Sequence, residues 1–176
     1  MAFTALAWTK LASSQSSISV NVPGGYQDLI VKCAIRGDRA SEDYLIMRVN
    51  GVSSTAYNWA NSYTDGASNA VAAGAASGLS VDTSMRVGHT PPSGSAANNF
   101  YVARIHCYSY ADSNVTKSFR WIGCYENAVT SGPVKTQHGG GFYNSTSTIT
   151  SISFHPVYGS NLVAGSTVAV YGYTHA

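Results

Sequence analysis

The amino-acid sequence predicts an all-β protein, folded as a two-sheet antiparallel β-sandwich of the jelly-roll type. Alternation of apolar and polar residues with a period of two, the pattern of a half-buried strand, dominates the chain. Eight or nine such stretches recur at near-regular spacing and are bounded by turn residues. Two packed sheets are the natural way to bury that many short strands. The best helix candidate, Asn69 to Ala76, is rich in alanine but interrupted by glycine.

The composition argues against two other classes of protein. Of the 176 residues, 44% are hydrophobic and only 10% are charged, against about 25% in an ordinary soluble domain. Ser (25), Thr (14), Ala (22) and Gly (17) take the place of the usual Lys and Glu. A disordered chain would need lower hydrophobicity and a net charge further from zero than +2. A helical bundle would need more Glu, Lys, Leu and Arg.

The first half of the chain supplies four expected strands. Residues 18–22 alternate aliphatic with polar side chains and end at a Pro-Gly-Gly turn. Residues 26–36 place four apolar side chains on one face, and 44–49 run into Asn-Gly, a strong turn dipeptide. Residues 55–63 carry three aromatic side chains at even spacing. These patterns are typical of strands that bury one face.

Five more strands are expected after residue 99. Residues 100–110 alternate throughout, and 116–124 do so around an aromatic pair. The pattern over 134–144 is weaker because three consecutive glycines interrupt it. Residues 148–156 carry apolar side chains on one face, and 166–173 form the last strand.

Two segments fall outside this pattern. Residues 61–98 contain few large apolar side chains and no sustained period, so we expect a long irregular loop, either an ordered excursion onto a neighbour or a plain crossover between sheets. Residues 1–16 are expected to form an N-terminal arm ahead of a single domain over 17–176. Phe3, Leu6 and Trp8 make this arm apolar. It packs back on the sandwich or, as we favour, docks on a partner.

The C-terminal segment from Ile149 to Tyr173 resembles a pattern in virion proteins of tailed phages. In that group an I-x-x-I strand is followed by a short loop, F-x-x-G-S, a strand and a terminal L-Y-G. This chain has Leu162 in place of the Phe and Val170 in place of the Leu, and both replacements stay apolar. The Ala164-Gly165-Ser166 stretch supplies a bulge or tight turn ahead of the last strand. The resemblance covers most of residues 20–173, with the final motif as its specific part.

Members of this group look like jelly-roll structural modules, either head decoration (cement) proteins or tail-fibre and tail-tip domains. The resemblance implies a virion structural protein, usually a homotrimer. We expect a capsid decoration protein, made in the host cytoplasm, that binds the phage major capsid protein on the capsid surface. The alternatives are a tail-fibre or tail-tip domain that recognises a host surface glycan, and a lectin or carbohydrate-active enzyme unrelated to phages.

The sequence points to no catalytic residue, cofactor or metal. The five histidines fall in none of the usual metal-binding spacings, and the eight acidic residues are scattered, mostly in turn contexts. There is no nucleophile elbow or phosphate-binding loop. No basic patch predicts nucleic acid, no segment predicts a membrane span, and the three cysteines fit buried, reduced thiols.

Two sets of aromatic side chains are the remaining candidates for partner binding. Tyr57, Trp59 and Tyr63 would share one face of a strand, as a core or interface row or as a platform for sugar rings. Tyr171 and Tyr173 lie on the face of the last strand opposite its buried valines, where a hydroxyl can reach a partner.

Overall fold

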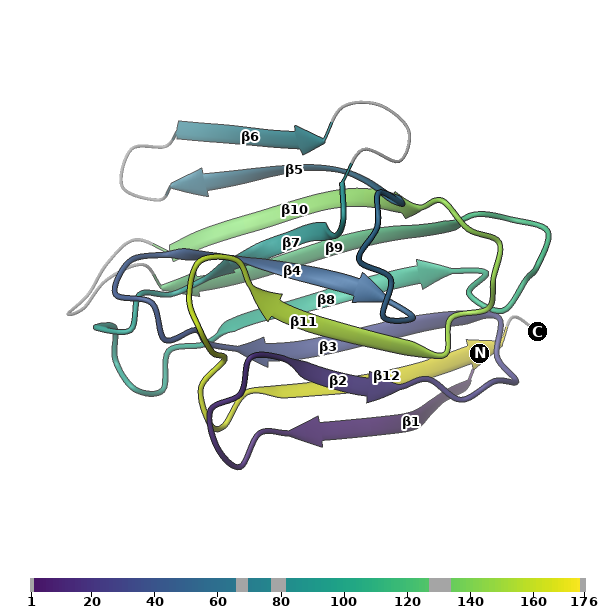
Figure 1. Cartoon of the computed structure of the whole chain (residues 1–176), viewed down its shortest axis with the longest axis horizontal. Coiled ribbons are helices and arrows are strands. Elements are labelled where there is room, and N and C mark those ends of the chain that lie inside the picture. The colour runs from purple at the N-terminus through teal and green to yellow at the C-terminus, as the bar shows by residue number, and fades with distance from the viewer. Residues whose placement is uncertain (1, 66–69, 77–81, 127–133, 175–176) are drawn as a thin grey trace.

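The protein is all-β, as predicted, and consists of two antiparallel sheets packed face to face (Figure 1). The computed structural model describes residues 2–65, 70–76, 82–126 and 134–174. These residues form twelve strands, more than the eight or nine predicted. None of the described residues forms a helix that could cross a membrane.

The larger sheet has eight strands and the smaller sheet has four. In spatial order, the large sheet contains β1 (Ala2–Lys10), β12 (Thr167–Thr174), β3 (Asp28–Ile35), β8 (Tyr101–Tyr108), β9 (Lys117–Glu126), β10 (Val134–Tyr143), β5 (Tyr57–Asp65) and β6 (Ala70–Ala76). The small sheet contains β2 (Ile18–Asn21), β11 (Ser151–Pro156), β4 (Asp43–Val49) and β7 (Met85–Thr90).

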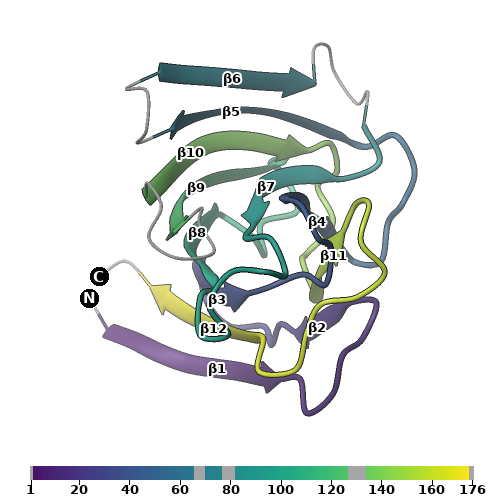
Figure 2. The same ribbon diagram turned by 90° about the vertical axis from the view of Figure 1, so that its left-hand side faces the viewer.

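Eight of these strands have the winding of a jelly roll. β1 pairs with β12, β2 with β11, β3 with β8, and β4 with β7. The chain is thus one long antiparallel hairpin rolled up so that successive strand pairs alternate between the sheets. β9, β10, β5 and β6 extend the large sheet beyond β8, and Figure 2 shows this extension arching over the β7 edge of the small sheet.

The long loop expected over 61–98 is largely wrong. β5 continues to Asp65, β6 pairs with it along its whole length, and β7 forms the edge of the small sheet. The best helix candidate, Asn69 to Ala76, is a strand over 70–76, because the edge of β5 offers hydrogen-bond partners that override the helix propensity of alanine. Residues 66–69 and 77–81, including Asn69, lie outside the described residues.

The segment expected as an N-terminal arm is built into the large sheet over residues 2–10. There β1 is the edge strand, paired with β12, and its register shifts between Ala5 and Ala7. This β-bulge leaves Leu6 partly buried against the core and turns Trp8 to the same side of the sheet as Phe3. Without the extra residue, simple alternation would point Phe3 and Trp8 to opposite faces.

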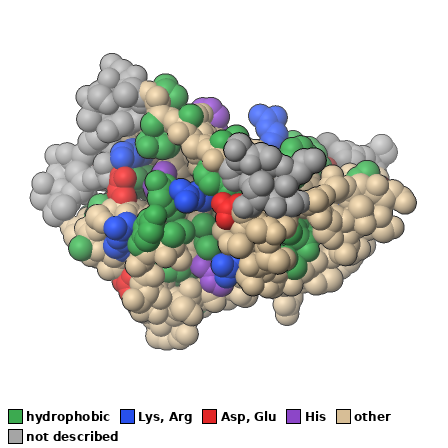
Figure 3. All heavy atoms as spheres, turned by 45° about the horizontal axis from the view of Figure 1, so that its top comes forward, with side chains coloured by type: hydrophobic (Ala, Val, Ile, Leu, Met, Phe, Trp, Pro, Cys, Tyr) green, Lys and Arg blue, Asp and Glu red, His purple; other side chains and the backbone are tan. Residues whose placement is uncertain are grey.

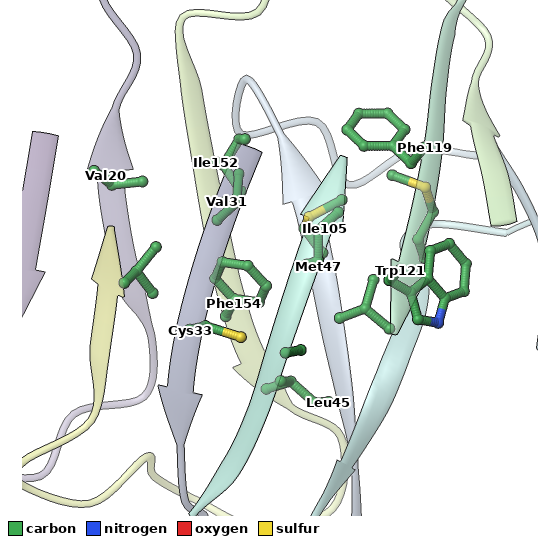
Figure 4. Packing of buried hydrophobic residues seen from close by; sticks show 14 of the residues in the cluster. Val20, Val31, Cys33, Leu45, Met47, Ile105, Phe119, Trp121, Ile152 and Phe154 are labelled. Atoms are coloured by element: carbon green, nitrogen blue, oxygen red, sulfur yellow. The ribbon is translucent and has the colours of Figure 1, made fainter. Parts of the chain in front are cut away.

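The core lies between the two sheets and is filled by the alternate residues of each strand (Figure 4). Ile105, Phe119 and Trp121 of the large sheet face Met47 and Phe154 of the small sheet.

The cysteines are free, as predicted, and Cys33 and Cys107 are buried, whereas Cys124 is half-buried. Burial raises the pKa of the Cys33 thiol to about 12, so this sulfur is an uncharged packing group.

Candidate functional site

The outward side of the large sheet, which we call the outer face, carries most of the large apolar side chains that the structure exposes. The small sheet covers the other side of the large sheet, so strand alternation turns every second residue outward. Among the described residues, only Val115 and Tyr158 are large exposed apolar side chains that lie elsewhere. Those on the outer face are Phe3, Trp8, Val71, Val102, Ile122, Val134 and Phe142.

Exposed apolar side chains lie at two places on the outer face, the β1 edge and the β9–β10 pair. On the β1 edge, Phe3 is 57% exposed and Trp8 is 65% exposed, and the ring of Phe3 packs against Tyr173. On β9 and β10, Ile122 is 62% exposed and Phe142 is 52% exposed. A freely solvated sheet face alternates polar residues outward, so these positions are candidates for a contact surface.

A buried polar cluster anchors the middle of the face. The hydroxyl of Tyr173 donates to Oδ2 of Asp28 at 2.8 Å and lies 2.6 Å from Nε2 of His106. Oδ1 of Asp28 accepts the backbone N–H of Ser109 at 2.7 Å, which ties the β8 end to β3. Burial, together with the hydrogen bond to Asp28, raises the pKa of Tyr173 to about 12, so its phenol stays protonated.

Beside this cluster lies a basic hollow of about 470 Å³ between β8, β9 and β10. Arg104, Arg120 and His138 line it, with Ile122 in their midst. Among the described residues, neither guanidinium has a hydrogen bond or an ion pair, and His138 lies 2.8 Å from the hydroxyl of Ser62. The outer face therefore combines exposed apolar side chains with cations that carboxylates of a partner could neutralise.

The predicted aromatic row of Tyr57, Trp59 and Tyr63 does share one face of β5, but that face points inward. Tyr57 is fully buried, and its hydroxyl donates to the carbonyl of Val52 at 2.9 Å. Trp59 is also buried, and its Nε1 donates to Asp82 at 2.9 Å. The first two rings are therefore core residues, and of the three only Tyr63 is partly exposed. Trp59 and Tyr57 thus form no surface platform for a sugar.

The other predicted partner-binding residues do reach the outer face, apart from Leu6. Phe3 and Trp8 are exposed there, whereas Leu6 turns toward the core. Tyr171 is half-buried beneath the ammonium of Lys32, which lies 5.2 Å from its ring centre. Tyr173 is buried in the cluster described above.

Sequence reasoning missed the β8–β10 half of the face. Val102, Arg104, Arg120, Ile122 and Phe142 all occupy positions that alternation assigns to solvent. The sequence did carry a signal: single strands have apolar residues at both odd and even positions. Apolar residues on both faces of a strand indicate that both faces are covered.

The described residues contain no group of three or more His, Cys, Asp or Glu side chains able to hold a metal ion.

Comparison with known proteins leaves this chain without an assigned family. No protein-family model matches it, and no curated protein matches its sequence. A solved structure of the infectious bursal disease virus VP2 subviral particle aligns with 98% of this chain and 40% of its own, at 10% identity and a TM-score of 0.15. A structure of the Gt strain of that virus aligns with 98% of this chain and 42% of its own, at 7% identity and a TM-score of 0.12. The chain thus spans about two fifths of each matched chain, and likeness at these scores bears on neither fold nor function.

Proposed function

We propose that this chain is a non-enzymatic structural protein of a tailed-phage particle, a decoration protein that forms a homotrimer and binds the major capsid protein on the assembled head. The virion setting and the trimer come from the resemblance of the C-terminal motif at Ala164-Gly165-Ser166 and Tyr171-Gly172. The single structural observation that supports a role in assembly is the outer face of the large sheet.

The chemistry of the outer face suits permanent burial against protein. Side chains such as Trp8 and Ile122 gain about 25 cal/mol for each Å² of apolar surface removed from water. The surrounding surface is rich in small, uncharged residues, which permit close approach of another backbone. Copies of the chain supply the apolar contacts, and carboxylates from a neighbouring subunit pair with Arg104 and Arg120.

Such a protein acts by mass action. A clamp that binds the assembled shell, and not its free subunits, stabilises the shell by RT ln(1 + [L]/Kd), where [L] is the concentration of the decoration protein. No bond is made or broken in this mechanism. The rigid sandwich holds the outer face in one shape, so little conformational entropy is lost on binding.

Co-sedimentation of the purified protein with empty, expanded phage heads tests this function. The expected result is saturable binding at a fixed ratio to the capsid lattice, with heads that survive a higher temperature when decorated. A trimer that ignores heads but binds host cells or their surface polysaccharide would instead identify a receptor-binding fibre domain.

A further inference from the structure

A second hollow, of about 390 Å³, lies at one end of the sandwich and shares no residue with the outer face. It forms where the loop before β4 and the turn after β11 meet β5 and β7. The face of the molecule that Figure 3 shows carries charged and histidine side chains mixed with hydrophobic ones. We call the hollow the tyrosine pocket, and it is lined by Arg39, Glu42, Tyr44, Tyr63, His89 and Tyr158.

Tyr158 is an exposed ring on an anchored turn. The side chain is 61% exposed, yet the buried carboxylate of Asp43 accepts the backbone N–H of Tyr158 at 3.0 Å and of Gly159 at 2.7 Å. The guanidinium of Arg39 lies 4.7 Å from the ring centre and holds one side of it. The turn is therefore ordered before any ligand arrives, which lowers the entropic cost of binding.

Two further tyrosines complete an aromatic wall around His89. The ring centre of Tyr44 lies 4.6 Å from that of His89, and the ring centre of Tyr63 lies 5.2 Å from it. The guanidinium of Arg86 sits 4.3 Å from the Tyr44 ring centre. Each ring is thus fixed by a neighbour, while the tyrosines keep part of their surface open to solvent.

The pocket offers both donors and acceptors. Among the described residues, the hydroxyls of Tyr44, Tyr63 and Tyr158 have no hydrogen-bond partner. Burial lowers the pKa of His89, so its ring is neutral near pH 7, and its Nδ1 accepts from the amide of the buried Gln137. The Nε2–H of that tautomer remains a donor.

Glu42 adds a carboxylate whose charge is already balanced. Its Oε1 forms an ion pair with the ammonium of Lys135 at 2.7 Å and accepts a hydrogen bond from the hydroxyl of Tyr125 at 2.5 Å. Its Oε2 stays available to accept a further hydrogen bond. Oε1 of the buried Gln137, whose amide nitrogen contacts His89, has no partner among the described residues.

These charges discriminate among ligand classes. A cation that approached the rings of Tyr44 or Tyr158 would meet the guanidinium groups already placed against them, whereas Glu42, whose charge Lys135 balances, serves as a hydrogen-bond acceptor for a neutral donor. A neutral, polyhydroxylated ring matches the groups of the pocket. Its C–H faces can stack on the aromatic side chains, and its hydroxyls can pair with the hydrogen-bond donors and acceptors. The volume falls near the lower end of ligand pockets, about 300–1,000 Å³, and suits one sugar ring.

We propose that the tyrosine pocket binds one neutral sugar residue of a glycan, independently of the assembly role of the outer face.

Saturation-transfer NMR on the intact protein tests this site. The probes are D-glucose, D-galactose, D-mannose, L-rhamnose and N-acetyl-D-glucosamine, with D-glucuronate and choline as charged comparators. We expect at least one neutral sugar to bind with a millimolar Kd, more tightly than either charged probe. Tyr158→Ala is expected to weaken that binding about tenfold, because it removes the exposed ring and little of the core.

Phe142→Ala is the matched control, since it removes a ring of similar exposure from the outer face and should leave sugar binding unchanged. Equal thermal midpoints for wild type and Tyr158→Ala establish that the turn still folds. The proposal is overturned if no neutral sugar shows transfer, if a charged probe binds more tightly, or if Tyr158→Ala binds as wild type does. Failure of trimer or head binding has no bearing on these readouts, so the two proposals fail separately.

Discussion

At the scale of single residues, two glycines make room for the buried ring of Tyr101. This ring lies between the sheets, and its hydroxyl donates to the carbonyl of Val87 at 2.7 Å. Gly88 on β7 and Gly123 on β9 leave the space that the ring fills. A Cβ atom would come within 2.3 Å of the ring at Gly88 and within 2.4 Å of the hydroxyl at Gly123. Both glycines are therefore required by volume.

Gly123→Ala is expected to destabilise the protein by about 1–3 kcal/mol, because the added methyl group overpacks the core against Tyr101. Equilibrium unfolding in urea measures the change. Gly24→Ala is the matched control, since a Cβ there has no heavy atom within 4 Å. Equal stability of the Gly123→Ala variant and the control would show that the ring has room to shift.

At the scale of elements, the connection between β8 and β9 depends on one buried ammonium. Lys117 is fully buried at the start of β9, and its Nζ donates to the carbonyls of Ser109 and Val115, each at 3.2 Å, and to that of Asp112. A single side chain thus satisfies three backbone acceptors of the turn. Burial lowers the pKa of Lys117 from its ordinary value of 10.5.

Lys117→Met is expected to lower the free energy of unfolding by about 1–3 kcal/mol, because it leaves these carbonyls without a donor. Amide hydrogen exchange should speed up in residues 109–116, with β3 and β12 much less affected. The pKa of Lys117 is lower in the folded protein than in the unfolded chain, so the unfolded chain holds this proton more tightly. The free energy of unfolding of the wild type should therefore rise as the pH approaches 10.5, and that of the variant should lack this rise. Lys32→Met, on an exposed lysine, is the control, and an equal response in both variants would contradict this account.

The elements also show how far the sequence predicts the fold. All nine expected strands are present, because apolar and polar residues alternate in each of them, if only weakly over 134–144, between turn residues. β6 was not predicted as a strand, because its alanines have almost no strand preference. They pair only because β5 provides a sheet edge. β7 was not predicted either, because its alternation of apolar and polar residues is short and Gly88 interrupts it.

The sites were harder to predict than the strands, because a sequence gives parity within a strand but not which parity faces the core. Tyr57 and Trp59 were placed correctly on one face of β5, yet that face turned out to be internal. The bulge at Leu6 moves Trp8 to the opposite face of the sheet from the one that simple alternation predicts, and no local residue pattern indicates this bulge. The tyrosine pocket joins β4, β5, β7 and the turn after β11, and only the three-dimensional fold brings these together.

At the scale of the whole molecule, the two proposed binding surfaces lie on different parts of one sandwich. The outer face is apolar with a basic centre, and the tyrosine pocket is polar, aromatic and small. Contacts through the first would leave the residues of the second uncovered by that interface. Under the two proposals, the protein would hold a glycan while it is assembled on the particle.

The central claim, that the outer face joins copies of this chain, is tested most directly by sedimentation equilibrium of three proteins. The account predicts a trimer for wild type, a monomer for the Trp8→Ser, Ile122→Ser double variant, and a trimer for Tyr158→Ser, which removes a side chain of similar exposure from elsewhere. A monomeric wild type would contradict the account, and so would a trimer that survives the loss of Trp8 and Ile122.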